Sequence, residues 1–248
     1  MARRLGEPMP ENFWRGNWHG SQSSSSPHHR AREIVRPTGG ILRGFVPSRK
    51  NGRLVHHEGL LERDAIALFE AHHRIAQYRE QPLTLQYPDG PRLRRYTPDF
   101  EVVLDTGEAV LVEVKPVRSL QAAEVGHKLA CIAAHMARTA RAFLVLDNTV
   151  IRQEPRLSNL QQILQHADHL MPTAAAVAVA LRQWGKHFPM PYQQAQQALA
   201  TLHLRPANLM LMGYLGCDLD VPFSPATELH LMKEENHAWF CLSQAHGF

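Results

Sequence analysis

The sequence predicts an α/β protein, in which a mixed β-sheet flanked by helices is followed by a small, mainly helical C-terminal region. Three observations favour this fold class. Residues 83–170 carry the patterns of strands, then a helix, a strand and a further helix. The Met171-Pro172-Thr173 break opens a region of short helices. The 248 residues are 44% hydrophobic and 20% charged, an ordinary globular composition with enough length for a sizeable core.

The elements before this break are expected from apolar spacing. The first helix carries one apolar stripe with Glu62 beside it, and Asp89-Gly90 favours a turn after the first strand. In order, we expect a basic, glycine-punctuated segment at 41–53, a helix at 57–76, strands around 83–87, at 94–104 and at 109–115, a helix at 120–141, a strand at 142–146 and a helix at 157–170.

The region after the break predicts short helices near 174–184, 191–202 and 206–213, and an alternating segment at 219–232. Three short helices and a hairpin fit a winged-helix-like module, although the same pattern fits any small helical domain.

The longest uninterrupted apolar stretch has eight residues, 174–181, and eight residues cannot cross a bilayer. The basic start of the chain is followed by Glu7, Pro8 and Pro10 instead of an apolar core, so we expect no secretory signal peptide. The expected location is therefore the cytoplasm.

The spacing of cysteine and histidine residues predicts no metal site. Cys131, Cys217 and Cys241 are scattered, without CxxC spacing, which predicts buried thiols and neither a disulfide framework nor a zinc knuckle. The histidine pairs, such as His56-His57, are adjacent in sequence, whereas metal ligands on a helix are usually three or four residues apart.

Positive charge is concentrated at the N-terminus. Residues 1–56 hold 10 basic and 3 acidic residues, whereas 57–171 and 172–248 carry slight negative balances. A basic arm suits contact with phosphate backbones, and Trp14 and Trp18 could add stacking on bases. The alternative is a solvated tail, because the stretch up to residue 30 is rich in Ser, His and Gly. We assign 1–40 as a basic, partly disordered arm.

A short loop predicts the register of the hairpin between the strands at 94–104 and 109–115. Asp105-Thr106-Gly107 suits a three-residue loop whose last residue is left-handed. If Leu104 then faces Glu108, Asp99 lies directly opposite Glu113.

Two opposed carboxylates need a counter-charge. Side chains about 5 Å apart with like charge repel by roughly 3 kcal/mol at an effective dielectric near 20. The period of two places Lys115 on the same face, about 7 Å further along, and turns Val110, Val112 and Val114 to the other face. One ammonium offsets part of the repulsion, and a divalent cation with a preference for oxygen, such as Mg²⁺, offsets it better.

The pattern Pro98-Asp99, thirteen residues, Glu113-Val114-Lys115 matches the PD-(D/E)xK nuclease signature in chemical outline, with Glu62 as a candidate third carboxylate. Each residue also has a structural explanation. Glu62 could face solvent on its helix, Asp99 could cap an edge strand, and Glu113 with Lys115 could form a solvated strand face.

At these residues the chain resembles the TnsA family, the endonuclease subunit of heteromeric Tn7-like transposases. The resemblance covers roughly residues 41–170. Four stretches carry it: GFVPSRKNGRLVHHEGLLERD at 44–64, REQPLTLQYPDG at 79–90, RRYTPDFEV at 94–102 and LVEVKP at 111–116. Gly59 stands where the family typically has Ser, a departure that is expected to alter a helix cap.

The resemblance implies a restriction-endonuclease-like domain at 41–171 that cuts DNA with Mg²⁺, or with Mn²⁺ as a substitute, and a partner-binding domain at 172–248. The implied subunit cuts the 5′, non-transferred strand at transposon ends together with a TnsB-like DDE recombinase, under control of a TnsC-like ATPase. The implied catalytic residues are Glu62, Asp99, Glu113 and Lys115. Glu62, Asp99, Glu113 and the Val114 carbonyl would hold metal, and Lys115 would orient the attacking water.

Three cations are candidate DNA contacts: Arg94 and Arg95 on the hairpin, and Lys128 on the following helix. Gln81, in the second matching stretch, is assigned a positioning role. Two other functions stay open, namely a stand-alone restriction-like or resolvase-like nuclease and a non-catalytic module of the same fold that docks on DNA or on a recombinase.

Overall fold

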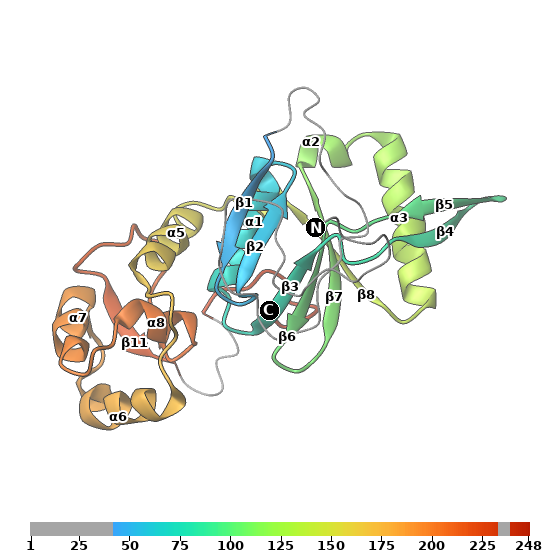
Figure 1. Ribbon diagram of the computed structural model, residues 1–248. Helices are drawn as coiled ribbons and strands as arrows, with labels where there is room; N and C mark the ends of the chain where they lie inside the picture. The colour runs from blue at the N-terminus through green and yellow to red at the C-terminus, as the bar shows by residue number, and fades with distance from the viewer. Residues whose placement is uncertain (1–41, 233–238) are drawn as a thin grey trace, which may run out of the picture.

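The computed structural model describes residues 42–232 and 239–248, and its centre is a four-stranded mixed sheet (Figure 1). The strand order is β3-β6-β7-β8, in which β3, β6 and β7 are antiparallel neighbours and β8 runs parallel to β7. The strands are β3 (Ile75–Glu80), β6 (Phe100–Leu104), β7 (Ala109–Lys115) and β8 (Ala142–Asp147). The prediction of a mixed sheet flanked by helices is confirmed.

Helices cover both faces of this sheet because β7 is apolar on both sides. Val110, Val112 and Val114 are buried in one core with helix α1 (Leu60–Ala71). Leu111 points the other way, into a smaller core with helix α3 (Ala123–Arg138). The remaining helices of this half are α2 (Val117–Leu120), α4 (Asn148–Ile151) and α5 (Arg156–His166).

Two further hairpins flank the sheet. One pairs β1 (Gly44–Ser48) with β2 (Arg53–His57), and the other pairs β4 (Leu85–Asp89) with β5 (Arg92–Tyr96). In Figure 1 the β4–β5 hairpin runs beside α3 and extends beyond the main sheet.

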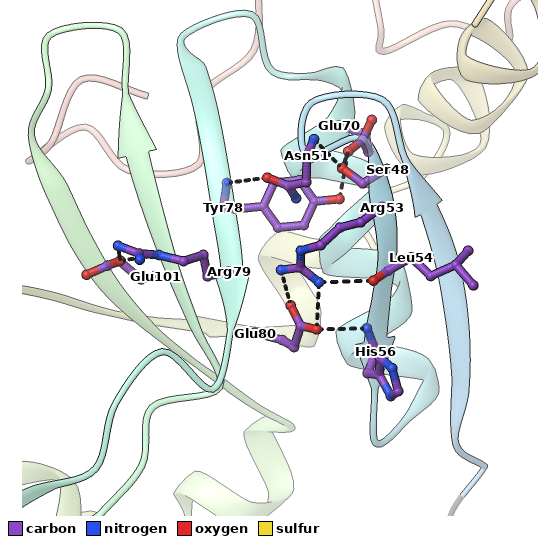
Figure 2. A network of polar contacts seen from close by, with 10 residues as sticks. All are labelled: Ser48, Asn51, Arg53, Leu54, His56, Glu70, Tyr78, Arg79, Glu80 and Glu101. Atoms are coloured by element: carbon purple, nitrogen blue, oxygen red, sulfur yellow. Dashed lines mark hydrogen bonds and ion pairs between the residues drawn. The ribbon is translucent and has the colours of Figure 1, made fainter. Parts of the chain in front are cut away.

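A buried polar network ties the β1–β2 hairpin to the sheet (Figure 2). Both guanidinium nitrogens of Arg53 donate to the Glu80 carboxylate, at 2.6 and 2.8 Å. The hydroxyls of Ser48 and Tyr78 both donate to Glu70, at 2.5 and 2.6 Å. Since buried charge-assisted hydrogen bonds hold geometry tightly, this network fixes the β1–β2 hairpin to α1 and β3.

The C-terminal part contains short helices and a small sheet of order β10-β11-β9. Helix α5 contacts both α1 and α8, and the buried residues of both halves form one continuous core, in which Phe240 and Phe248 pack around His72. The elements, in order, are α6 (Ala174–Trp184), the 3₁₀ turn η1 (Gly185–His187), β9 (Met190–Pro191), α7 (Tyr192–Ala200), α8 (Pro206–Leu211), β10 (Leu215–Gly216) and β11 (Glu228–Leu231).

Several predicted boundaries are wrong. The helix expected at 57–76 is shorter, because β2 runs to its start and β3 occupies its end. The strand expected at 94–104 is two strands of different sheets, separated at Pro98, which has no N–H to donate to a ladder. Hairpin β1–β2 was not expected. The helix expected at 120–141 is α3, which is shorter at both ends and follows the short helix α2. Only part of 219–232 is a strand.

The prediction of buried thiols holds for Cys217 alone, because Cys131 is half-buried and Cys241 exposed, and all three thiols are free. Within the described ranges, no helix has the length and apolar character needed to span a membrane. The arm assigned to 1–40, with Trp14 and Trp18, lies outside the described residues.

Candidate active site

The β6–β7 hairpin has the register that its loop predicts. Phe100 pairs with Val112 and Val103 with Ala109. The Leu104 N–H donates to the Glu108 carbonyl at 2.8 Å, and Gly107 has the left-handed φ of +85°. This register places Asp99, just before β6, across from Glu113 on β7.

Asp99, Glu113 and Lys115 converge on one point. The Lys115 Nζ lies 2.8 Å from Glu113 Oε1 and 3.6 Å from Asp99 Oδ2. The Val114 N–H donates to Asp99 Oδ2 at 2.8 Å, and the Val114 carbonyl oxygen lies 3.4 Å from Lys115 Nζ. Glu113 is only 2% exposed, so it is not part of a solvated strand face.

Glu62 faces this group from the first turn of α1. Its carboxylate accepts a 2.7 Å hydrogen bond from the Glu58 N–H, and Lys115 and Glu113 lie within electrostatic reach. Glu62 is half-buried, and this burial raises the pKa of its carboxyl group. The helix begins after Gly59, which has no side chain to cap it, so the Glu62 carboxylate pairs a backbone N–H at this end.

The cluster has an excess of negative charge. Burial, and then the Glu113 carboxylate, raise the pKa of Asp99 to about 7, while Lys115 opposes the shift. Burial alone would lower the pKa of Lys115, but Asp99 and Glu113 outweigh burial and raise it. A protonated Lys115 therefore faces three carboxyl groups, and a divalent cation fits this donor set electrostatically.

Gln81 adds an unused acceptor beside Asp99. Its backbone N–H donates to the Asp99 carbonyl at 2.8 Å, and its φ of +44° is unusual for a residue with a side chain. Its amide Oε1 is buried and has no hydrogen-bond partner among the described residues. Since an orphaned buried acceptor is costly, this atom marks a position where a ligand or its water could bind.

Tyr96 is a site residue that the sequence patterns missed. Its hydroxyl donates to Glu113 Oε2 at 2.6 Å, and its ring lies beneath the Lys128 ammonium, 5.6 Å from the ring centroid. Burial and the Glu113 carboxylate raise the Tyr96 pKa far above its usual range, so the phenol stays protonated. Tyr96 is the one buried residue of an otherwise exposed β5, a position that the sequence pattern does not reveal.

The three candidate DNA contacts lie around the β4–β5 hairpin and α3, with Arg94 on the same face of β5 as Tyr96 and Arg95 on the opposite face. Arg94 and Arg95 are exposed on β5, and Lys128 is exposed on α3 above the Tyr96 ring. Arg94 also pairs with Asp89, whereas the register places Arg95 across from Gln86.

Comparison with known protein families gives a match to part of the chain. A family model described as TnsA-like endonuclease N terminal matches residues 72–148. The matched segment begins after Glu62 and includes all four strands of the central sheet with Asp99, Glu113 and Lys115. A search of curated proteins found no match.

Proposed function

We propose that this chain, whose residues 72–148 belong to the TnsA-like endonuclease family, is the Mg²⁺-dependent endonuclease subunit of a Tn7-like transposase. It cuts the 5′, non-transferred strand at transposon ends, together with a TnsB-like DDE recombinase and under control of a TnsC-like ATPase. The observation that carries this proposal is the convergence of Lys115 with Asp99 and Glu113 at 3.6 and 2.8 Å.

Asp99, Glu113, the Val114 carbonyl and Glu62 would hold the metal. When bound, Mg²⁺, or Mn²⁺ in its place, supplies Lewis-acid polarisation of the phosphodiester and a water of lowered pKa. The excess carboxylate charge and the orphaned Gln81 Oε1 support a cation with its water at this position.

The chain's own groups orient the reaction. The Lys115 ammonium stays protonated because its carboxylate neighbours raise its pKa, so it can position the attacking water and stabilise charge that develops on the non-bridging oxygens. The Tyr96 hydroxyl and the Val114 N–H each hold one carboxylate by a hydrogen bond, which restricts Glu113 and Asp99 to the geometry of the site.

The DNA duplex would lie across the β4–β5 hairpin and α3. Arg94, Arg95 and Lys128 are exposed there, and Lys128 covers the ring whose hydroxyl contacts Glu113. Contacts from these cations to phosphates would fix the position of the backbone relative to the carboxylates without reading sequence.

The C-terminal part, 172–248, would be a winged-helix-like domain that binds protein partners. The order α6, β9, α7, α8, β10, β11 supports this topology. All six residues of α8 are buried, so α8 has no free face to enter a DNA groove, and the region's slight negative charge also favours a protein partner.

A strand-specific cleavage assay tests the proposal. Purified chain is incubated with element-end DNA, with and without the recombinase and the ATPase, in Mg²⁺ or in EDTA. We expect 5′-strand nicks only with Mg²⁺ and partners, loss of nicking in Lys115→Ala with partner binding retained, and unchanged nicking in the exposed hairpin control Glu108→Gln.

Three results would overturn the proposal. Nicking by Lys115→Ala at the wild-type rate removes the assigned site. Efficient cutting of plasmid DNA by the chain alone favours a stand-alone restriction-like or resolvase-like nuclease. Absence of nicking together with absence of Mg²⁺ binding in calorimetry, with DNA present, favours a non-catalytic docking module.

A further inference from the structure

A second group of metal-ligating side chains lies outside the nuclease cluster. Asp89 ends β4, and His127 and Cys131 lie one turn apart on α3. The His127 Nε2 is 2.8 Å from Asp89 Oδ1 and 3.6 Å from Cys131 Sγ. One ligand atom from each residue lies within 4.8 Å of the other two.

Strand β4 and helix α3 bring the side chains of Asp89, His127 and Cys131 close together. The spacing of four residues puts His127 and Cys131 on one face of α3, which packs against β4. Arg94 Nε binds Oδ2 of Asp89 and so turns the other oxygen, Oδ1, toward His127. An orienting partner of this kind is typical of carboxylates that ligate metals.

The distances between the ligand atoms are close to those around a tetrahedrally coordinated ion. Around zinc, with bonds near 2.0 and 2.3 Å, an imidazole nitrogen and a thiolate sulfur lie about 3.6 Å apart, and nitrogen and oxygen about 3.4 Å apart. The nitrogen–sulfur distance already has this value, and the nitrogen–oxygen pair needs to open by about 0.6 Å. The His127 side chain is 65% exposed, so water can reach the fourth position.

We propose that Asp89, His127 and Cys131 form a three-ligand site for a divalent transition ion of the zinc class, which clamps the base of the β4–β5 turn to α3. Thiolate and imidazole select such an ion against Mg²⁺, so this site and the carboxylate cluster take different metals. The clamp would hold the hairpin that carries Arg94, Arg95 and Tyr96. The inference does not depend on nuclease activity.

Cobalt(II) is the probe that tests the site. The full chain is titrated with Co²⁺ in excess Mg²⁺, which occupies the carboxylate cluster. We expect a thiolate-to-cobalt charge-transfer band that saturates at one ion per chain and is displaced by Zn²⁺. Because other histidines can bind Co²⁺ without such a band, the band itself is the measurement.

Variants separate this site from the other thiols and histidines. Cys131→Ser is expected to abolish the band, and His127→Ala and Asp89→Asn to weaken Co²⁺ binding at least tenfold. Cys241→Ser, the other accessible thiol, and His135→Ala, on the same helix, serve as matched controls and should retain it. A band that survives in Cys131→Ser, or the absence of any band in the wild-type chain, overturns the site.

Amide hydrogen exchange tests the clamp itself, without relying on a variant that could fail to fold. Zn²⁺ should slow exchange of the β4 amides in the wild-type chain and leave those of β1 unchanged. Zn²⁺ binding without slower exchange in β4 would overturn the clamp.

Discussion

The β6–β7 and β4–β5 hairpins share antiparallel pairing and a tight turn with a left-handed glycine, yet they present opposite surfaces. The β6–β7 hairpin lies within the four-stranded sheet, where helices cover both faces and nearly every residue of β7 is buried. The β4–β5 hairpin belongs to no larger sheet, and β5 is exposed except at Tyr96.

The difference shows that a hairpin within a covered sheet buries its charged side chains, whereas a hairpin outside the sheet exposes them. Charges in the covered hairpin are held at low dielectric, so burial and the Glu113 carboxylate raise the pKa of Asp99, and the two carboxylates raise the pKa of Lys115. Cations in the projecting hairpin are exposed to solvent, where Arg94 also pairs with Asp89. Tyr96 joins the two, because it ends the exposed strand and binds the buried carboxylate of Glu113.

The largest effect on nicking is expected when the β6–β7 hairpin, which helices cover on both faces, loses a carboxylate charge. Asp99→Asn keeps the shape and can still accept the Val114 N–H, but it should abolish nicking in the assay with partners. It should also stabilise the fold, because the carboxylate that is removed is the one that burial and Glu113 disfavour.

The sign of the pH dependence follows from the raised pKa. Burial and the Glu113 carboxylate raise the pKa of Asp99 from its ordinary 3.8 to about 7 in the folded chain, so the folded chain binds more protons between these values and loses stability as pH rises through them. Asp99→Asn should therefore melt at a higher temperature than the wild-type chain at pH 8, and at a similar temperature at pH 4. Mg²⁺ at pH 8 should reduce the difference in melting temperature between Asp99→Asn and the wild-type chain. Equal melting temperatures at pH 8 without Mg²⁺ would contradict the raised pKa of Asp99.

A smaller effect on nicking is expected from a change at Tyr96, through which the β4–β5 hairpin contacts Glu113 of the β6–β7 hairpin. Tyr96→Phe removes the hydroxyl that holds Glu113 Oε2 and keeps the ring beneath Lys128. Loss of such an outer-shell hydrogen bond typically costs 10- to 100-fold, so we expect the Mg²⁺ concentration for half-maximal nicking to rise about tenfold.

Tyr87→Phe is the matched control for this change. Tyr87 is a buried tyrosine of the same hairpin, whose ring meets that of Tyr96 edge to face. It should nick like the wild-type chain. An equal effect of both substitutions would assign Tyr96 to packing alone.

The sequence predicted the covered hairpin well because local rules determine it. The period of two and the left-handed residue Gly107 were enough to give the register, the bounds of β7 and the meeting of Asp99 with Glu113. The strong helix α1 was also recognised, although its bounds differ from the expected 57–76.

The projecting hairpin was predicted poorly because its contacts are non-local. Pro98 separates two strands that look continuous in sequence, and only the folded chain shows that Tyr96 ends the first of them. The pairing of Asp89 with His127 and Cys131 joins residues 38 or more positions apart. His127 and Cys131 have the four-residue spacing of ligands on a helix, but patterns built on histidine pairs and CxxC do not include a mixed His–Cys pair.

The smallest effect is expected on the exposed hairpin, where a single cation is lost. Arg95→Ala should weaken binding of duplex DNA a few-fold, equally for all sequences, and reduce the slope of log K against log salt by about 0.9. Arg138→Ala, at the far end of α3, removes the same charge from another exposed position and should leave the slope unchanged. Equal slopes for both variants would mean that net charge, and not the β5 surface, sets the affinity. A change in Arg95→Ala alone would place the DNA backbone over the hairpin that ends at Tyr96, next to the carboxylates.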